Sequence, residues 1–487
     1  MTDMPKETIS MSTQPLDKLK SSCLNFSELL AQNIALISPT MTAALIVPLM
    51  FSNSGNISWF SYALGALMLL FVAFNLNQFA RRLTGAGSMY TYSALGLGPT
   101  LGSMSGWCLI WAYIFIGLAG TTGFTIFAGK ILAVMGVHPP DTLLFLICLG
   151  ACFFLAYKDI VISQIVMLIL EAVSCTLITL LCLIVLGHHG TAVFDASQFD
   201  FKSATWSSLG LGVVVAVFSL VGFESSTAFG EEAKGGTKTI PRSIIWSLIL
   251  TGSFFVFVTY TEVLGTRGYT VDGKPVTLDA IDAPLSVLSG MYGVPWLAIP
   301  LSAGAMVSFF ALALSCMNAG ARVMFAMSRH GAFHECFRRS HKSNETPHIA
   351  LAGMAVIMFG IVSICSISGT ATLDAFNDAG TMGAFGFLGA YTLICLAAPL
   401  YLKKIGELKA KDMAFCVAAL VLLLIPAVGS VYPVPAPPVN YFPYVFLVYL
   451  GAGLFRAVAY KIRDPKSLAK IRDELADMRM PGGLAYK

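Results

Sequence analysis

The sequence predicts an all-α polytopic membrane protein with twelve transmembrane helices. Hydrophobic residues make up 56% of the 487-residue chain and charged residues only 11%, where about 25% is usual for a soluble protein. Mean hydropathy is +0.77. The formal net charge of +4 is scattered over predicted loops rather than gathered in one arm, so nucleic acid is excluded as a partner. The lipid bilayer is the environment that this composition suits.

Apolar runs long enough to cross a membrane recur along the whole chain. A bilayer core needs about 20 apolar residues per helical crossing. With that length as the criterion, the predicted spans are 29–52, 57–79, 101–134, 142–157, 161–187, 206–231, 241–265, 294–327, 348–368, 376–402, 412–431 and 441–461.

The distribution of basic residues gives the orientation of these spans. Loops on the cytoplasmic side of a membrane protein carry an excess of Lys and Arg. With the N-terminus inside, all but four of the 30 basic residues fall on the inner side, the exceptions being Lys130, Lys202, Arg267 and Lys274. We therefore predict a multi-pass protein of the cell inner (plasma) membrane with both termini in the cytoplasm.

Two of the predicted spans are interrupted near mid-membrane. The first contains Ser38, Pro39, Thr40, Met41 and Thr42, where Pro39 removes a backbone donor from the helix. The sixth contains a run from Phe218 to Thr227 that places a flexible glycine beside an acid and hydroxyl groups. Broken helices at corresponding positions, in spans one and six, are typical of an inverted five-plus-five repeat, in which the breaks bind the substrate.

This repeat divides the chain into four parts. We predict a cytoplasmic N-terminal tail at 1–28, a ten-helix transport core at 29–402, two additional transmembrane helices at 403–461 and a cytoplasmic C-terminal tail at 462–487. The predicted substrate-binding residues are those of the two breaks: Ser38, Pro39, Thr40, Met41, Thr42, Phe218, Ser219, Val221, Gly222, Phe223 and Glu224.

Acidic residues inside spans are candidates for ion coupling. Glu171 lies about ten residues into the fifth span, between apolar neighbours. An ionised acid at that depth costs on the order of 3 kcal/mol, so it must be protonated, paired with a cation or facing water. Glu171 could carry a proton or ligate Na⁺, or form a structural hydrogen bond. Glu224 could contact a substrate amine, relay a proton or bind the backbone of its own helix.

Other polar residues have simpler explanations. Glu231 and Glu232 lie at the cytoplasmic end of span six, where pairing with nearby basic residues is the expected role. His330 and His334 are expected to be surface residues of a basic loop, since no third metal ligand accompanies them. The 11 Cys form no CxxC pair and no Cys/His cluster. We predict no catalytic residues, no metal site and no cofactor, and hence no enzyme.

Several motifs together resemble the amino acid-polyamine-organocation permeases, over about residues 30–460. The motifs are GSMYTYSALGLGPTLGSMSGW at 87–107, FSLVGFESSTAFGEEAKGGTKTIPRSI at 218–244, ARVMFAMSRHGAFHECF at 321–337 and ETPHIAL at 345–351. The resemblance implies an inverted repeat with two extra helices, alternating access, and a substrate held between spans one, three, six and eight. Ser38 to Thr42 would occupy the family's first-helix substrate loop and Phe218 to Glu224 its sixth-helix loop.

This sequence departs from the family pattern in two places. Many members have a Gly-rich first-helix loop whose bare amides bind a carboxylate, whereas this chain has SPTMT, which offers hydroxyl groups. Several proton-coupled members place a Lys in span five, where this chain has Glu171. The predicted function is uptake of an amino acid by secondary active transport with H⁺ as the coupling cation, Na⁺ being the other candidate. A polyamine or amino-alcohol importer and an amino acid/amine exchanger are the alternatives, and the oligomeric state is not predicted.

Overall fold

The computed structural model describes residues 19–463 apart from 204, 272, 282 and 433. Most of both predicted tails, at 1–18 and 464–487, therefore lies outside the described residues. The helices are α1 (Phe26–Ile37), α2 (Pro39–Met41), α3 (Val47–Ser54), α4 (Ser58–Ala80), α5 (Ser88–Leu97), α6 (Pro99–Val134), α7 (Asp141–Lys158), α8 (Ile160–His189), α9 (Trp206–Leu220), α10 (Gly236–Gly265), α11 (Pro284–Met291), α12 (Ala298–Arg329), α13 (His348–Ile367), α14 (Thr372–Lys404), α15 (Ala410–Gly429) and α16 (Phe442–Arg463).

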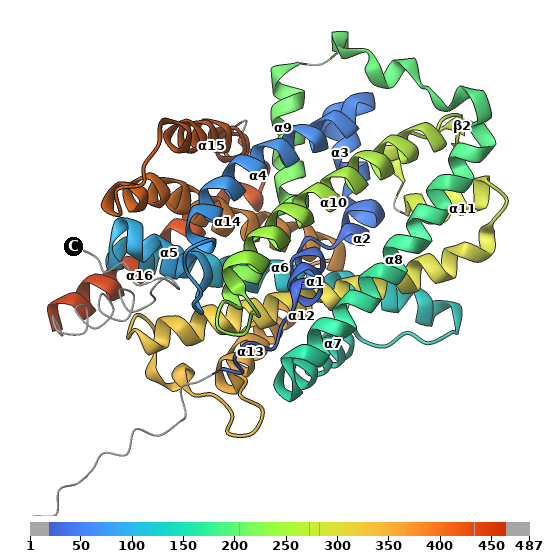
Figure 1. Ribbon diagram of the computed structural model, residues 1–487. Coiled ribbons are helices and arrows are strands. Elements are labelled where there is room, and N and C mark those ends of the chain that lie inside the picture. The colour runs from blue at the N-terminus through green and yellow to red at the C-terminus, as the bar shows by residue number, and fades with distance from the viewer. Residues whose placement is uncertain (1–18, 204, 272, 282, 433, 464–487) are drawn as a thin grey trace, which may run out of the picture.

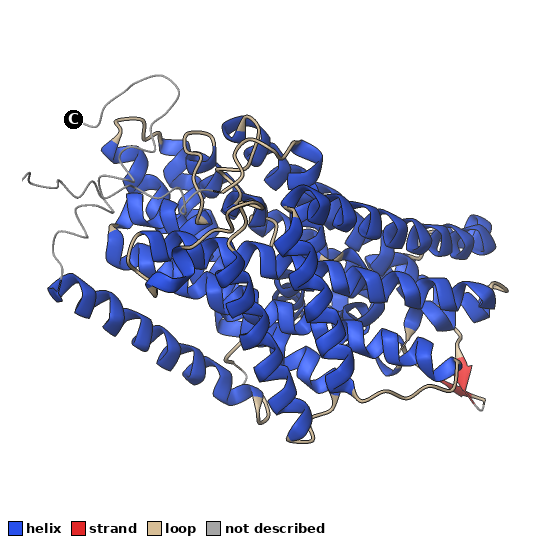
Figure 2. Cartoon of the chain, turned by 90° about the horizontal axis from the view of Figure 1, so that it is seen from below, coloured by secondary structure: helices blue, strands red, loops and turns tan. Residues whose placement is uncertain are grey.

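Strands are almost absent from the described part of the chain, which contains one short hairpin. Its strands are β1 (Thr270–Val271) and β2 (Lys274–Pro275), paired antiparallel after the end of α10. Figure 2 shows this hairpin at one end of a bundle of long helices. The all-helical prediction is confirmed.

Ten helical stretches among the described residues are long and apolar enough to cross a membrane. The first of them, Phe26–Ala80, is 55 residues long and contains both of the first two predicted spans. In the sixth predicted span, 206–231, α9 ends at Leu220 and is too short to be among these ten stretches, and the break predicted within this span begins where the helix ends. Helix α5 was not predicted, because its residues were assigned to a loop.

The centre of the bundle is formed by α6, which packs along α12 and α14 (Figure 1). Small residues allow this close approach. A Cβ added at Gly386 of α14 would lie 2.5 Å from the backbone oxygen of Cys108 and 2.8 Å from the backbone nitrogen of Ala112, both in α6. Helices that lack a hydrophobic driving force between them associate through such small-residue contacts. The α6–α14 contact therefore requires glycine at this position.

The chain before α1 is fixed to the start of α10. The backbone amides of Cys23 and Leu24 donate to the carbonyl of Glu232 at 2.8 and 2.9 Å, and the amide of Lys234 donates to the carbonyl of Leu24 at 2.8 Å. The Lys20 ammonium lies 2.7 Å from the Asp159 carboxylate. We call this end of the bundle, which carries Lys20, Arg81, Arg322 and Arg329, the basic end, and the opposite end the hairpin end.

Candidate functional site

The first break lies between α1 and α2. Helix α1 ends at Ile37, and Ser38 has φ 50° and ψ 76°, the left-handed region that non-glycine residues rarely adopt. Pro39 then opens α2, and the chain continues through a π-helical turn, Thr42–Ile46, into α3. The hydroxyl groups of Thr40 and Thr42 are buried and find no hydrogen-bond partner among the described residues. Unpaired buried hydroxyls are costly, so these two groups are available to a ligand.

The second break follows α9. Val221 is extended, with φ −61° and ψ 150°, and Gly222 has φ 98°. A Cβ at Gly222 would lie 1.9 Å from Cδ2 of Leu36 in α1, so only glycine fits between the two helices. The chain then forms a 3-10 turn, η6 (Ser225–Ala228). The two breaks are therefore in direct contact, through Gly222 and Leu36.

Asn33 of α1 also ties the breaks together. Its Oδ1 accepts hydrogen bonds from the backbone amide of Ser226 at 2.7 Å and from the hydroxyl of Ser225 at 3.1 Å. Its Nδ2 lies 3.5 Å from the hydroxyl of Ser247 in α10. One side chain in α1 thus satisfies the backbone and hydroxyl groups that the second break leaves unpaired.

Glu224 lies at the second break, between two tyrosines. The Tyr391 hydroxyl of α14 donates to Oε2 of Glu224 at 2.6 Å, and the Tyr113 hydroxyl of α6 lies 3.4 Å from Oε1. The backbone amide of Gly222 donates to the Tyr391 oxygen at 3.3 Å. Glu224 is fully buried and has no ion-pair partner among the described residues. A cationic group that reached Glu224 would meet an acceptor that has no counter-charge among the described residues.

Glu171 of α8 is connected to the first break by hydroxyl groups. Its Oε1 accepts a hydrogen bond from Ser308 of α12 at 2.7 Å, and the Ser308 hydroxyl lies 3.1 Å from that of Ser38. The other oxygen, Oε2, is buried without a partner in the described part of the chain. Glu171 and Glu224 therefore belong to separate hydrogen-bonded groups, one at each break.

The remaining predicted substrate residues are buried around the breaks. Ser219 lies 3.2 Å from the Tyr62 hydroxyl, and the ring of Phe223 lies 5.3 Å from that of Tyr391. Phe218 packs on Gly380 of α14. Pro39, Met41 and Val221 are buried within their own turns. The structure places all the predicted residues at one or other break; their roles in substrate binding stay predictions.

The acids at the basic end form ion pairs, as expected from the sequence. Arg322 of α12 binds Glu232 through two bonds, Nε to Oε2 at 2.5 Å and Nη2 to Oε1 at 2.6 Å, and both side chains are fully buried. The Arg322 guanidinium also lies 4.3 Å from the centroid of the Phe229 ring. Arg329 and Glu231 form a more exposed pair at 2.8 Å. These contacts join α12 to the residues that follow the second break.

The expectation for His330 was wrong. Its side chain is 6% exposed, and its Nδ1 lies 2.9 Å from the Tyr90 hydroxyl of α5. Burial, with a smaller contribution from the neighbouring Arg329, lowers the pKa of His330 to about 4. The cause of the error is α5, which was not predicted and which covers this position. His334, by contrast, is exposed as expected.

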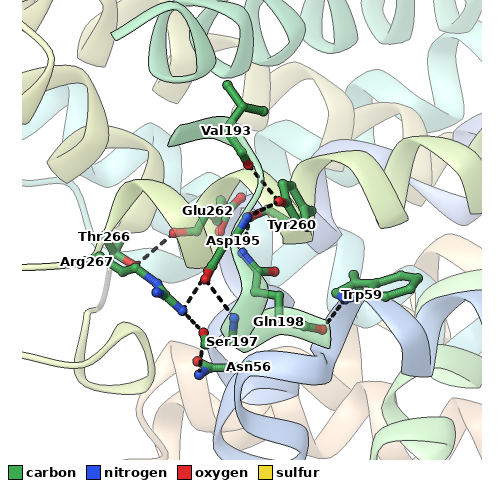
Figure 3. Close-up of polar contacts among 10 residues, drawn as sticks. All are labelled: Asn56, Trp59, Val193, Asp195, Ser197, Gln198, Tyr260, Glu262, Thr266 and Arg267. Atoms are coloured by element: carbon green, nitrogen blue, oxygen red, sulfur yellow. Dashed lines mark hydrogen bonds and ion pairs between the residues drawn. The ribbon is translucent and has the colours of Figure 1, made fainter. Parts of the chain in front are cut away.

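Sequence reasoning missed Glu262 of α10, an acid buried within an apolar helix. It is fully buried, and neither carboxyl oxygen has a hydrogen-bond partner among the described residues. Figure 3 shows it near the Arg267–Asp195 ion pair, in which the two groups are 2.6 Å apart. Arg267 thus pairs with Asp195 rather than with Glu262. An acid within the apolar run VTYTEVLG was the available signal.

Comparison with known proteins assigns the family. The sequence model of the amino acid permeases matches residues 26–454. The chain belongs to this family. It is therefore a multi-pass membrane transporter and not an enzyme.

Individual relatives differ in what they carry. The chain is 24% identical to a branched-chain amino acid permease of Bacillus subtilis, over 72% of this chain and 74% of that protein. It is 25% identical to a low-affinity putrescine importer of Escherichia coli, over 67% and 71% of the two chains. It is 25% identical to a methylthioribose transporter of Bacillus subtilis, over 83% and 86%. These similarities leave the substrate open.

Proposed function

We propose that this permease takes up an amino acid by proton-coupled symport with alternating access. The observation that carries the proposal is the pairing of two contacting helix breaks with a buried acid at each. Glu224 at the second break would accept hydrogen bonds from the substrate ammonium group. The hydroxyls of Thr40 and Thr42 would contact its polar substituents, and the rings of Phe218 and Phe223 would limit its size.

Glu171 is the proposed proton carrier. A carboxyl that keeps one oxygen unpaired in a buried site gains free energy when it is protonated, because an ionised carboxylate without a partner costs several kcal/mol there. Ser308 links this carboxyl to Ser38, so a change in the charge of Glu171 reaches the backbone of the first break through two hydrogen bonds. Loading a proton would thereby change the conformation of the substrate site.

An amine lacking a carboxylate is the second candidate substrate. Thr40 and Thr42 offer hydroxyl groups where a carboxylate is best bound by free backbone amides, and Glu224 favours a positive charge. A polyamine or amino-alcohol importer, or an amino acid/amine exchanger, would use the same two breaks. Na⁺ bound at Glu171 is the corresponding alternative for the coupling cation.

The architecture that we propose for this mechanism is the inverted repeat. Residues 29–402 would form its two five-helix halves, and 403–461 two additional helices, which gives twelve crossings. The basic end would face the cytoplasm of a cell inner membrane, the side on which both termini are predicted from the sequence. Peptide mass spectrometry separates an introduced thiol from the 11 native cysteines; the thiol of Lys342→Cys should then react with an impermeant maleimide only in inside-out vesicles, and that of Lys274→Cys only in right-side-out vesicles.

Uptake into proteoliposomes tests the transport mechanism. Matched compounds, an amino acid, its decarboxylated amine and the corresponding amino alcohol, are presented under a pH gradient, a Na⁺ gradient or no gradient. The Glu171→Gln variant should retain counterflow exchange and lose concentrative uptake under the pH gradient, and Glu335→Gln on an exposed surface serves as the control. Concentrative uptake by Glu171→Gln equal to that of the wild type would remove Glu171 from coupling. Uptake that requires preloaded internal substrate would identify an exchanger.

A further inference from the structure

A basic cavity lies at the surface of the bundle where α4 ends and α10 begins. The two helices run antiparallel and side by side (Figure 1), with the Asn77 amide 3.3 Å from the carbonyl of Pro241. The cavity has a volume of about 500 Å³, and its lining includes Arg81, Lys238, Arg242 and no acidic residue. Three positive charges therefore surround one open space.

These charges lack counter-charges among the residues that the structure describes. None of the three forms an ion pair with an acid among the described residues, whereas Lys20, Arg82 and Arg329 at the same end each do. The Arg242 guanidinium instead lies 5.4 Å from the centroid of the Phe26 ring, which holds it beside the cavity. Three like charges around one cavity repel one another, and an anion bound among them would relieve that repulsion.

The neighbouring cavity shows why this one is distinctive. It has a volume of about 400 Å³, shares Arg81 and contains further basic residues, but Glu407 and Asp412 also line it. The Arg82–Glu407 ion pair, at 2.6 Å, neutralises part of its charge. Of these two cavities, the one beside α10 has a positive charge that no acidic lining residue compensates.

An apolar surface leads away from the basic cavity along α10. Trp246 lines the cavity and is 46% exposed, and Ile249 and Leu250, at three and four residues further on, are 43% and 45% exposed. Residues at this spacing lie on one face of a helix. Tryptophan is enriched where membrane lipid meets water, and the face beyond it would contact acyl chains. A free phosphate ion would use the basic cavity and gain nothing from this apolar face.

We propose that this cavity binds the phosphodiester headgroup of an anionic phospholipid, with the acyl chains lying along Trp246, Ile249 and Leu250. Arg81, Lys238 and Arg242 would contact the phosphate oxygens, since basic pockets between transmembrane helices bind lipid headgroups. Helix α10 follows directly on the second helix break, so the bound lipid would anchor the segment on which Glu232 and its partner Arg322 close the basic end. The proposal is independent of which substrate the protein carries.

Native mass spectrometry of the full chain tests the site, with phosphatidylglycerol and phosphatidylcholine titrated into the detergent-solubilised protein. The wild type should retain one phosphatidylglycerol more tightly than phosphatidylcholine. The triple variant Arg81→Gln/Lys238→Gln/Arg242→Gln should bind it about a hundredfold more weakly, at about fivefold per basic residue. A control triple, Arg338→Gln/Arg339→Gln/Lys342→Gln, removes the same charge from exposed positions of another loop and should bind normally.

A second measurement locates the lipid. Brominated phosphatidylglycerol should quench the fluorescence of the wild type more than that of Trp246→Phe, and this comparison keeps the test valid if the triple variant fails to fold. Equal loss of binding in both triple variants would mean that only net charge attracts the lipid, and would overturn a defined site. Displacement of the lipid by inorganic phosphate alone would reassign the cavity to a soluble anion. Quenching unchanged by Trp246→Phe would place the lipid elsewhere.

Discussion

Replacing Arg322 by Met should be among the most destabilising single changes in this protein. Met keeps much of the side-chain volume but leaves the Glu232 carboxylate fully buried and unpaired. Removing one partner of a buried ion pair costs about 3–5 kcal/mol, because the remaining charge is neither solvated nor compensated. The contact of the guanidinium with the Phe229 ring, at 4.3 Å, is lost as well. The free energy of unfolding, measured by titration with SDS in mixed micelles, should fall by this amount.

Two comparison variants separate the buried charge from other effects. Arg322→Met/Glu232→Leu removes both charges and should recover most of the lost stability. Arg329→Met breaks the more exposed pair, whose side chains are 30% and 26% exposed, and should cost about 1 kcal/mol or less. If Arg322→Met and Arg329→Met were equally stable, the reasoning from burial would be wrong.

The thiol of Cys23 reports on the same ion pair. Its backbone amide donates to the Glu232 carbonyl, and burial, followed by the charge of Glu232, raises the pKa of the Cys23 thiol to about 11. A thiol with such a pKa reacts slowly with maleimides at neutral pH. Arg322→Met removes a positive charge that lowers this pKa, so faster labelling of Cys23 can come only from loosening of the contact; we expect the loosening to dominate, and peptide mass spectrometry distinguishes Cys23 from the other cysteines. Unchanged labelling would show that the pair does not hold the N-terminal segment.

Further variants test the breaks and a buried histidine. Gly222→Ala places a methyl group against Leu36, at a position whose backbone is left-handed. The variant should lose at least about 1–2 kcal/mol of stability and take up less substrate. Uptake equal to that of the wild type would show that the two breaks separate freely. Tyr391→Phe removes a hydrogen bond to Glu224 and should change the KM for substrate by about tenfold at unchanged expression, and an unchanged KM would remove Tyr391 from the site. The pKa of His330 is lowered from 6.5 to about 4, so the unfolded chain binds a proton more readily than the folded one. The free energy of unfolding should therefore decline by about 3 kcal/mol as the pH falls from 6.5 to 4. Unfolding curves across that range should show this decline for the wild type, and the contribution of this residue should be missing in His330→Asn.

The sequence predicted the backbone of the site better than its side-chain contacts. Pro39 and Gly222 act through local rules, a missing amide and a left-handed conformation, so both breaks could be located from the residues themselves. The contacts of Glu224 could not. Tyr113 and Tyr391 lie in apolar runs more than 100 residues away, where a tyrosine is indistinguishable from a core residue until the helices are placed side by side.

The errors share one physical cause. His330 was assigned to the surface because the loop around it is basic, but α5 packs over it. The sixth span was predicted to cross the membrane with a break in it, whereas contacts with α1 end its helix at Leu220 and hold the run that follows in an irregular conformation. In each case a distant segment determined the local structure, and a pattern within one sequence window contains no information about that segment.

The backbone pairing of residues 22–24 with 231–234 has a practical consequence for work on this protein. A tag or fusion partner that displaces residues 22–24 would disturb the contact of the N-terminal segment with the residues that follow the second break. Truncation beyond Leu24 would also remove Lys20 and expose Asp159. Tags on this protein should therefore leave residues 19–24 and their contacts intact.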